Sequence, residues 1–266
     1  MSGRAIAGLG AVVVAAGLLV GFRQATRGNE TAEGIAASGG SSAQTPWGEP
    51  NLMGVWKAEA LGARSGRDTF NLTTLEGLYK PEARARMRRL SANDDPTLRC
   101  TAPAFPRAAM SGHRLQIIQS PGFAFVFTEA YPVARIIPTT GRPHTSEKYL
   151  FPTYLGDSTG RWEGNTLVVD VTSFNGEGWL AGGVDKPTRA STGVWLTSDA
   201  LHVVERWRRG GVDTLEYQAR VEDPQMLTAR WETPTVTFKR QAVDRIEEAL
   251  CLPEDDPATY LTRLGS

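Results

Sequence analysis

The stretch that sets the fold of this chain is GDSTGRWEGNTLVVDVTSFN, residues 156–175. Two runs of strand-forming residues, Ser158–Glu163 and Thr166–Thr172, flank the dipeptide Gly164–Asn165. Glycine takes the positive φ that a type II′ turn requires at its first central position, so the pattern predicts a two-residue β-hairpin. In the second run Leu167, Val169 and Val171 alternate with Thr166, Asp170 and Thr172. That alternation predicts a strand with one face on a core.

Strand patterns of the same kind cover most of the chain after residue 114. Asp213–Glu222 alternates strictly, with Leu, Tyr, Ala and Val at every second position. The other predicted strands are Leu115–Gln119, Phe123–Glu129, Val133–Ile137, Gly193–Thr197, Leu201–Arg208 and Met226–Arg240. Many short strands joined by turns, without alternating helices, favour a closed meander.

Two helices are predicted beside these strands. Pro81–Leu90 begins with proline and an acidic residue and ends in arginines, which suits the helix dipole. Val243–Leu250 is predicted as a second, C-terminal helix. The expected fold is all-β: a lipocalin-like antiparallel barrel or strongly curved meander with short flanking helices, plus an N-terminal apolar helix.

The N-terminal region predicts the compartment. Ala5–Phe22 is an uncharged run of mostly Ala, Val, Leu and Gly between arginines, typical of a membrane anchor or a signal segment. We therefore expect residues 1–27 to be the anchor or signal, 28–50 a flexible linker rich in small residues, and 51–266 the barrel domain. The domain would be exported to the periplasmic or cell-envelope side and tethered through the N-terminal helix, an uncleaved anchor being favoured over a removed signal peptide.

Cys100 and Cys251 are the two cysteines of the chain. In an exported protein a small, even number of cysteines favours a disulfide, and two buried free thiols are the alternative.

Two resemblances bear on the fold. Gly54-Val55-Trp56 at the start of the first strand resembles the lipocalin signature, in which the tryptophan closes one end of a barrel. The run at 156–175, followed by LHVVERWRRGGVDTLEYQARVEDP, resembles an uncharacterised family of exported bacterial proteins with a GDSxGxWEGxTLVVDxxxFN signature. This resemblance covers most of Asp95–Glu254 and implies a shared fold without an activity. In that family a short histidine-containing segment precedes the Leu-His-Val strand, whereas Asp185–Thr192 contains no histidine here.

Charge and motif spacing exclude several functions. A formal net charge of zero gives no general attraction for nucleic acid. The three histidines, His113, His144 and His202, lie far apart and match no metal-binding spacing. We therefore expect no metal and no cofactor.

Charges on apolar strand faces point to the interior of the barrel. Glu205 shares a face with Leu201, Val203 and Trp207, and Arg135 lies between Val133 and Ile137. An inward carboxylate and an inward guanidinium are costly unless they are paired, so they form either a structural ion pair or a polar anchor for a ligand. Residues predicted to line the cavity around them are Phe123, Phe125, Phe127 and Tyr217.

A serine nucleophile is the next candidate. Gly156–Gly160 matches G-x-S-x-G, with Ser158 at its centre and His202 and Asp170 as possible partners. In a nucleophile elbow the serine leads into a helix, whereas here it leads into a strand. A locally capped turn is the alternative interpretation.

Loops at one end of a barrel commonly carry its specificity. The segments 142–155 and 175–179 combine cations, histidine, amide and aromatic side chains. The predicted ligand-binding residues are Arg142, Asn175 and Trp179 together with Arg135 and Tyr217. The candidate catalytic residues are Glu205, His202, His144 and Ser158.

These patterns predict an exported, membrane-tethered β-barrel that binds a small apolar or aromatic molecule. A different class of function stays open, namely a lyase, isomerase or hydrolase that acts on an apolar substrate inside the barrel. A third possibility is a structural envelope protein with a filled barrel and no ligand.

Overall fold

The computed structural model describes residues 43–59, 72–129, 131, 133–145, 151–184 and 191–247. All of them belong to the second of two compact units, Ala37–Ser266. The predicted N-terminal helix, the linker up to residue 42 and Cys251 lie outside the described residues, so the anchor and the Cys100–Cys251 disulfide stay predictions.

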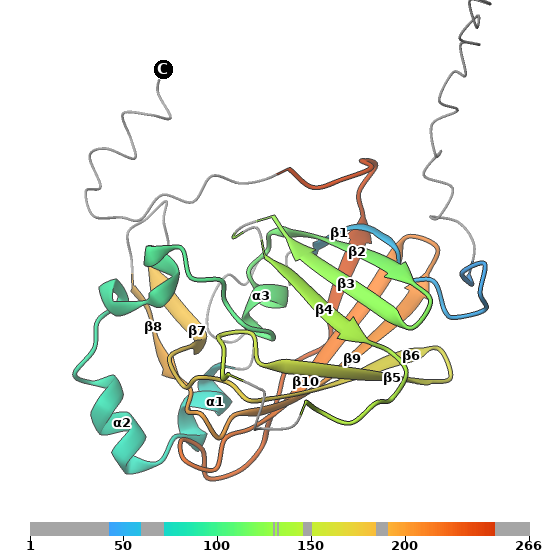
Figure 1. The fold of residues 1–266 in the computed structure, drawn as a ribbon. Coiled ribbons are helices and arrows are strands. Elements are labelled where there is room, and N and C mark those ends of the chain that lie inside the picture. The colour runs from blue at the N-terminus through green and yellow to red at the C-terminus, as the bar shows by residue number, and fades with distance from the viewer. Residues whose placement is uncertain are drawn as a thin grey trace, which may run out of the picture. The chain divides into compact units, whose positions relative to one another are not determined.

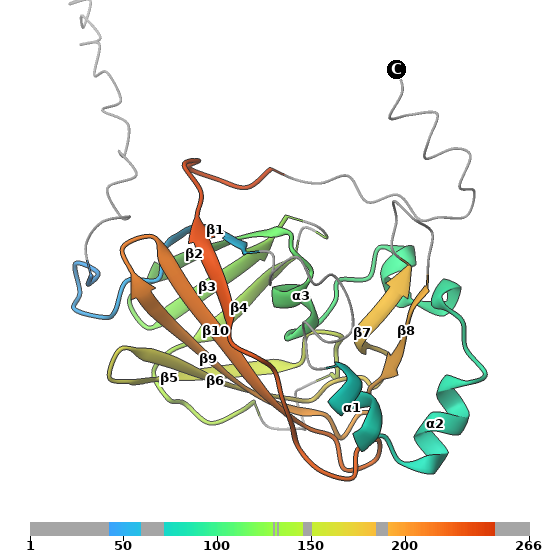
Figure 2. The same ribbon diagram turned by 180° about the vertical axis from the view of Figure 1, so that it is seen from behind.

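The described chain is mostly antiparallel β-structure, curled into a nearly closed barrel (Figures 1 and 2). Neighbouring strands follow the order β4-β3-β2-β1-β12-β10-β9-β6-β5, and β11 pairs with β10. The strands are β1 (Gly54–Ala58), β2 (Arg114–Ser120), β3 (Phe123–Thr128), β4 (Ala134–Pro138), β5 (Asp157–Glu163), β6 (Thr166–Thr172), β9 (His202–Gly211), β10 (Thr214–Glu222), β11 (Trp231–Glu232) and β12 (Val236–Arg240). The predicted all-β barrel is confirmed in this coarse form.

The barrel closes where β4 meets β5. Each neighbouring pair in the order is antiparallel, so β4 and β5, the first and the last of the nine strands, run in the same direction. The N–H of Gly141 donates to the carbonyl oxygen of Gly160 at 2.9 Å across this seam. A Cβ on Gly160 would lie 3.0 Å from Ile137 Cγ2 and 3.2 Å from the Pro138 carbonyl oxygen. Glycine therefore lets the two strands approach.

The predicted hairpin at Gly164–Asn165 is confirmed. Glu163 pairs with Thr166 on either side of the turn, and Gly164 has a φ of 59°. Leu167, Val169 and Val171 are buried, as the alternation predicted. Val168 is buried as well, so part of the outer face of β6 is also covered.

Side chains fill the interior of the barrel. The largest fully buried ones on its strands are Trp56, Leu115, Ile137, Trp207, Leu215, Tyr217, Trp231 and Phe238. Phe105, from the segment before α3 (Arg107–Met110), plugs one end. Its ring lies 5.7 Å from that of Trp207 and 6.1 Å from that of Tyr217, centroid to centroid.

The expectation that Phe123, Phe125 and Phe127 line the interior is wrong. Ala124 and Val126 are the buried residues of β3, and Phe123 is 42% exposed and stacks on Phe125 on the outer face. The alternating pattern shows that β3 has two different faces. Which face lies inside the barrel depends on the volume that the other interior side chains leave free. Val126 lies opposite Arg135 in the ladder. The large side chains that already fill the interior leave space on β3 only for small inward-facing residues.

A second, two-stranded sheet and short helices lie beside the barrel (Figure 2). The sheet is the hairpin of β7 (Trp179–Val184) and β8 (Ser191–Leu196), inserted between β6 and β9. The helical elements are α1 (Leu72–Leu78), α2 (Pro81–Met87), η2 (Ala92–Asp94), η3 (Pro96–Arg99) and α3. The guanidinium of Arg107 pairs with Asp95 and donates to the Gly182 carbonyl oxygen at 2.9 Å, which ties α3 to η3 and β7.

The helix predicted at Pro81–Leu90 is observed as α2, which ends at Met87. Ala83 in its first turn is buried, whereas Leu90, the predicted last residue, lies beyond the helix and is exposed.

Two C-terminal predictions are corrected. Val243–Leu250 is not helical over residues 243–247, because Gln116 holds this segment through the Asp244 carbonyl oxygen and the Ile246 N–H. The single strand predicted over Met226–Arg240 is two strands, β11 and β12, since a turn on Asp223 occupies its first residues.

Part of the predicted linker belongs to the folded domain. Gln44 pairs with Pro50, and the N–H of Thr45 donates to the Glu49 carbonyl oxygen at 2.8 Å. Glu49 also accepts a hydrogen bond from the Trp47 indole. The barrel domain thus includes residues before Asn51.

Candidate functional site

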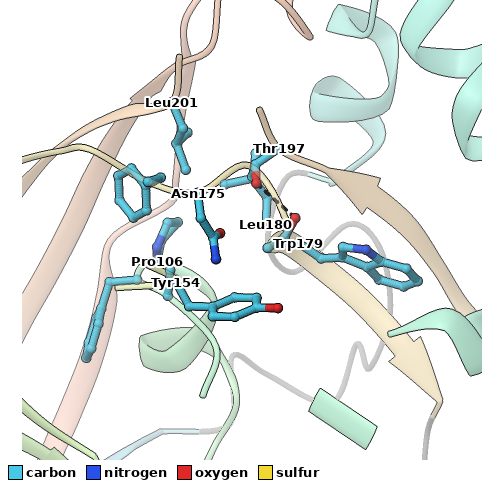
Figure 3. A pocket seen from close by; sticks show the side chains of 11 residues that line it. Pro106, Tyr154, Asn175, Trp179, Leu180, Thr197 and Leu201 are labelled. Carbon is cyan, nitrogen blue, oxygen red and sulfur yellow. Dashed lines mark hydrogen bonds between the residues drawn. The ribbon is translucent and has the colours of Figure 1, made fainter. Parts of the chain in front are cut away.

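A pocket lies at the end of the barrel where β6 ends and β9 begins, beside the β7–β8 hairpin. We call it the mouth pocket. Its lining is mostly aromatic and apolar: Ala104, Phe105, Pro106, Tyr154, Phe174, Asn175, Gly178, Trp179, Leu180, Thr197 and Leu201 (Figure 3). The space that a water-sized sphere can occupy is about 10 Å³, room for about one water molecule. A larger ligand therefore requires lining side chains to move apart.

Asn175 brings an amide to this apolar lining. Its Oδ1 accepts a hydrogen bond from the Glu177 N–H at 3.1 Å, whereas no partner among the described residues uses its Nδ2. The Tyr154 hydroxyl donates to Glu177 at 2.6 Å, and this bond raises the pKa of Tyr154. An amide donor beside aromatic walls is an arrangement that can orient a small ligand.

A second group of polar side chains lies deeper, inside the barrel. We call it the inner polar cluster: Arg135, Ser158, Glu205, Trp207 and Tyr217. Arg135 Nη1 donates to both carboxylate oxygens of Glu205 at 2.9 Å, and Arg135 Nε donates to Ser158 Oγ at 2.9 Å. The Trp207 indole N–H also donates to Glu205, at 2.9 Å. The prediction that Arg135 and Glu205 face the interior within reach of one another is confirmed.

Two polar atoms of this cluster have no hydrogen-bond partner among the described residues. They are Arg135 Nη2 and the hydroxyl oxygen of Tyr217, Oη, and both are buried. Burial, reinforced by the charge of Glu205, raises the pKa of Tyr217 well above its ordinary value, so the hydroxyl keeps its proton. Buried polar atoms normally find a partner in a protein or a water molecule, so this pair marks a place for a further group.

Phe105 separates the mouth pocket from the inner polar cluster. It lines the pocket, and the Arg135 guanidinium carbon lies 4.9 Å from its ring centroid. Its ring also contacts the rings of Trp207 and Tyr217. One side chain thus stands between the two sites.

A third group lies on the outer face of the barrel beside the seam. We call it the His–Asp cluster: His144, Asp157, Asp170 and His202. His144 places Nδ1 at 2.9 Å from Asp157 and Nε2 at 2.9 Å from Asp170. His202 Nε2 lies 3.1 Å from both oxygens of Asp170. The ring of His144 therefore bridges a carboxylate on β5 and a carboxylate on β6.

The serine-nucleophile interpretation finds no assembled triad. Asp170 and His202 lie together, but Ser158 pairs with Val171 on the inward-facing register of β5 and β6 and is bound by Arg135. Adjacent residues of a strand face opposite sides, so Ser158 and Asp170 lie on different sides of the wall. Glu205 is likewise bound by two donors, the Arg135 guanidinium and the Trp207 indole.

The His–Asp cluster is held by hydrogen bonds. Within the described ranges, no group of three or more His, Cys, Asp or Glu side chains is arranged to hold a metal ion. His144 directs its two nitrogens to carboxylates on two different strands, β5 and β6. The two nitrogens and the carboxylates therefore do not converge on one point.

Two predicted ligand-binding residues, Asn175 and Trp179, line the mouth pocket. Two others, Arg135 and Tyr217, belong to the inner polar cluster on the other side of Phe105. Arg142 lies apart from them: its guanidinium donates to the Pro143 carbonyl oxygen and lies 3.9 Å from Asp157. Their binding roles stay predictions.

Sequence reasoning missed Phe105 and Asp157. Phe105 lies in the irregular segment between η3 and α3, where no periodicity marks a buried face. Asp157 meets His144 only because the barrel closes, although Asp170 on β6 and His202 on the neighbouring β9 were both visible as polar positions on alternating strands.

In the part of the chain that the structure describes, no helix has the length and apolar character needed to cross a membrane. Comparison with protein-family models and with curated proteins gives no match.

Proposed function

We propose that this protein binds a small apolar or aromatic molecule in the mouth pocket, in a domain exported and tethered by its N-terminal segment. The observation that supports binding is the lining itself, to which Phe105, Tyr154, Phe174 and Trp179 contribute aromatic residues and Asn175 contributes an amide. Burial of apolar ligand surface against such walls supplies affinity, and the Asn175 Nδ2 supplies orientation.

The interior of the barrel does not offer that space itself, since aromatic and aliphatic side chains fill it. The proposal therefore places the ligand at the end of the barrel, where the segment just before α3 and the strand β7 contribute lining residues that belong to no barrel strand. Export and tethering rest on the apolar run Ala5–Phe22 and on the sequence resemblance to exported bacterial proteins.

Fluorine NMR of the full chain labelled with fluorotryptophan tests this proposal with isopropylbenzene as the probe. The resonance of Trp179, assigned through Trp179→Phe, is expected to shift and saturate as the probe is added. Trp56, fully buried on β1, provides an internal reference whose resonance is expected to change little.

A blocked variant and a matched control sharpen the test. A Cβ on Gly178 would make only an ordinary contact, 3.6 Å from Thr197 Oγ1, so Gly178→Leu adds bulk inside the pocket without backbone strain. Gly77→Leu makes the same change on α1, where a Cβ meets nothing within 4 Å. We expect Gly178→Leu to abolish the shift and Gly77→Leu to preserve it. A Trp179 resonance that never responds, or responds equally in both variants, refutes binding in this pocket.

A further inference from the structure

The inner polar cluster offers two hydrogen-bond donors that nothing in the described chain uses. Arg135 has five N–H groups, and its contacts to Glu205 and Ser158 leave Nη2 unpaired. Tyr217 is fully buried, and its hydroxyl is unpaired too. Leaving such groups unsatisfied costs stability, which a ligand or a water with an acceptor oxygen would restore.

The charges around these donors restrict the acceptor. Arg135 is already neutralised by Glu205, and each is almost completely buried. An anionic ligand would bring a second negative charge close to Glu205 inside the barrel, where uncompensated charge is expensive. A neutral carbonyl oxygen accepts hydrogen bonds without that penalty.

Phe105 connects this chemistry to the mouth pocket. Its ring contacts the Arg135 guanidinium and the Tyr217 ring on one side and lines the pocket on the other. A rotation of this side chain would join the apolar pocket to the two donors and would also enlarge the small space that the pocket now offers.

We propose that the ligand of the mouth pocket is a neutral aromatic or apolar carbonyl compound, whose oxygen takes the hydrogen bonds of Arg135 Nη2 and Tyr217 Oη once Phe105 turns aside. This inference rests on the proposed function, because it names the chemical class of the ligand that the pocket binds. The apolar body of the ligand lies among the aromatic lining, and its oxygen reaches through the position of the Phe105 ring.

Three probes of similar size test the inference in the full chain: acetophenone, isopropylbenzene and benzoate. Acetophenone carries the carbonyl, isopropylbenzene has nearly the same shape without an acceptor, and benzoate adds a charge. Affinities follow from the shift of the Trp179 resonance. One or two hydrogen bonds to the neutral carbonyl oxygen correspond to about five- to thirtyfold in affinity, so acetophenone is expected to bind tighter than isopropylbenzene by that factor. Benzoate is expected to bind more weakly than acetophenone.

Two Tyr→Phe variants locate the carbonyl. Tyr217→Phe removes an unpaired hydroxyl, so it is expected to cancel most of the acetophenone preference without lowering the melting temperature. Tyr79→Phe removes a buried hydroxyl that donates to the Leu196 carbonyl oxygen at 2.7 Å. It is expected to lower the melting temperature and to leave the preference intact.

A crystal structure with acetophenone gives the direct view, with the carbonyl oxygen within hydrogen-bond distance of both donors and Phe105 in a new rotamer. Equal affinity for acetophenone and isopropylbenzene in the parent overturns the carbonyl inference and leaves the proposed function standing. So does a structure in which a water molecule occupies both donors while acetophenone stays in the outer pocket. Failure of all three probes to bind refutes the proposed function and this inference together.

Discussion

Arg135 on β4 and Glu205 on β9 form an ion pair inside the barrel, with Arg135 Nη1 at 2.9 Å from each oxygen of the carboxylate. The two strands are separated by β5 and β6 around the wall, so the pair spans the interior. Ser158 and Trp207 complete the contacts, and the two charged side chains are at most 5% exposed. Such a pair ties two separate parts of the barrel wall together across the interior.

Loss of one partner should therefore destabilise the domain strongly. Arg135→Leu or Glu205→Leu leaves a buried uncompensated charge, and each is expected to lower the free energy of unfolding by about 3–5 kcal/mol. The double Leu variant removes both charges and is expected to cost much less than the sum. Urea denaturation of the four proteins measures the coupling. Additive single-variant losses would show that the pair is not an energetic unit.

Glu205→Gln separates a structural role from a ligand role. Gln keeps the shape and one acceptor oxygen for Trp207, but it loses the charge that balances Arg135. If Glu205 acts only through the ion pair, stability falls and acetophenone binding to the folded fraction persists. Loss of binding with an unchanged melting temperature would instead assign the carboxylate to the ligand site.

The seam between β4 and β5 predicts a specific sensitivity. A methyl group on Gly160 would press on Ile137 and on the Pro138 carbonyl oxygen at 3.0–3.2 Å, so Gly160→Ala is expected to cost about 1–3 kcal/mol of unfolding free energy. Gly77→Ala on the exposed face of α1 meets nothing and is expected to leave stability unchanged or slightly raised. Chemical denaturation compares the two, and equal stabilities would contradict the close approach at the seam.

Alternation along the strands predicted the parts of the structure that depend on neighbouring residues. The hairpin at Gly164–Asn165 and the inward positions of Arg135 and Glu205 followed from period-2 patterns. Because a charge on an apolar face needs a partner, an ion pair was one of the expected arrangements. The two residues can pair with each other if the barrel curls so that their strands face each other across the interior. The sequence thus predicted a pair without showing which strands lie between them.

Features that depend on closure or on side-chain volume were not predictable in this way. The inward face of β3 is decided by the bulk already inside the barrel, which places Ala124 inward and Phe123 outward. The strand β7 contains Gly182 and Gly183, which have no side chains to display a period. Phe105 lies in an irregular segment, and its role between two sites emerges only from its ring contacts.

The predicted compartment has its own test. Cells expressing the full chain should retain it in the membrane fraction, and thiol labelling under denaturing, non-reducing conditions should find Cys100 and Cys251 unreactive. A link across about 150 residues would constrain the unfolded chain by roughly 4–5 kcal/mol on the loop-entropy view. Reduction should therefore lower the melting temperature. Two reactive thiols in exported protein would contradict the disulfide.

The His–Asp cluster gives the domain an acid-sensitive contact between His144, in the segment that follows β4, and the outer face of the barrel wall. Asp170 accepts from His144 and His202, Asp157 accepts from the other nitrogen of His144, and Arg142 lies 3.9 Å from Asp157. Burial acts to raise the pKa of Asp170, but the hydrogen bonds from both histidines outweigh it and hold that pKa below its ordinary value of 3.8. Ionised Asp170 is therefore favoured in the folded state.

The sign of the pH dependence follows from that shift. Because the pKa of Asp170 is lower in the folded than in the unfolded chain, its stabilisation is complete above pH 3.8 and is lost as the pH falls through the folded pKa. Asp170→Asn is expected to lose about 1–2 kcal/mol at pH 5, and its deficit against the parent should shrink below pH 3.8. Asp199→Asn, where the amide oxygen still accepts from Gln225, should match the parent throughout. Urea titrations from pH 2.5 to 6 measure all three, and a deficit that grows on acidification would reverse the assignment.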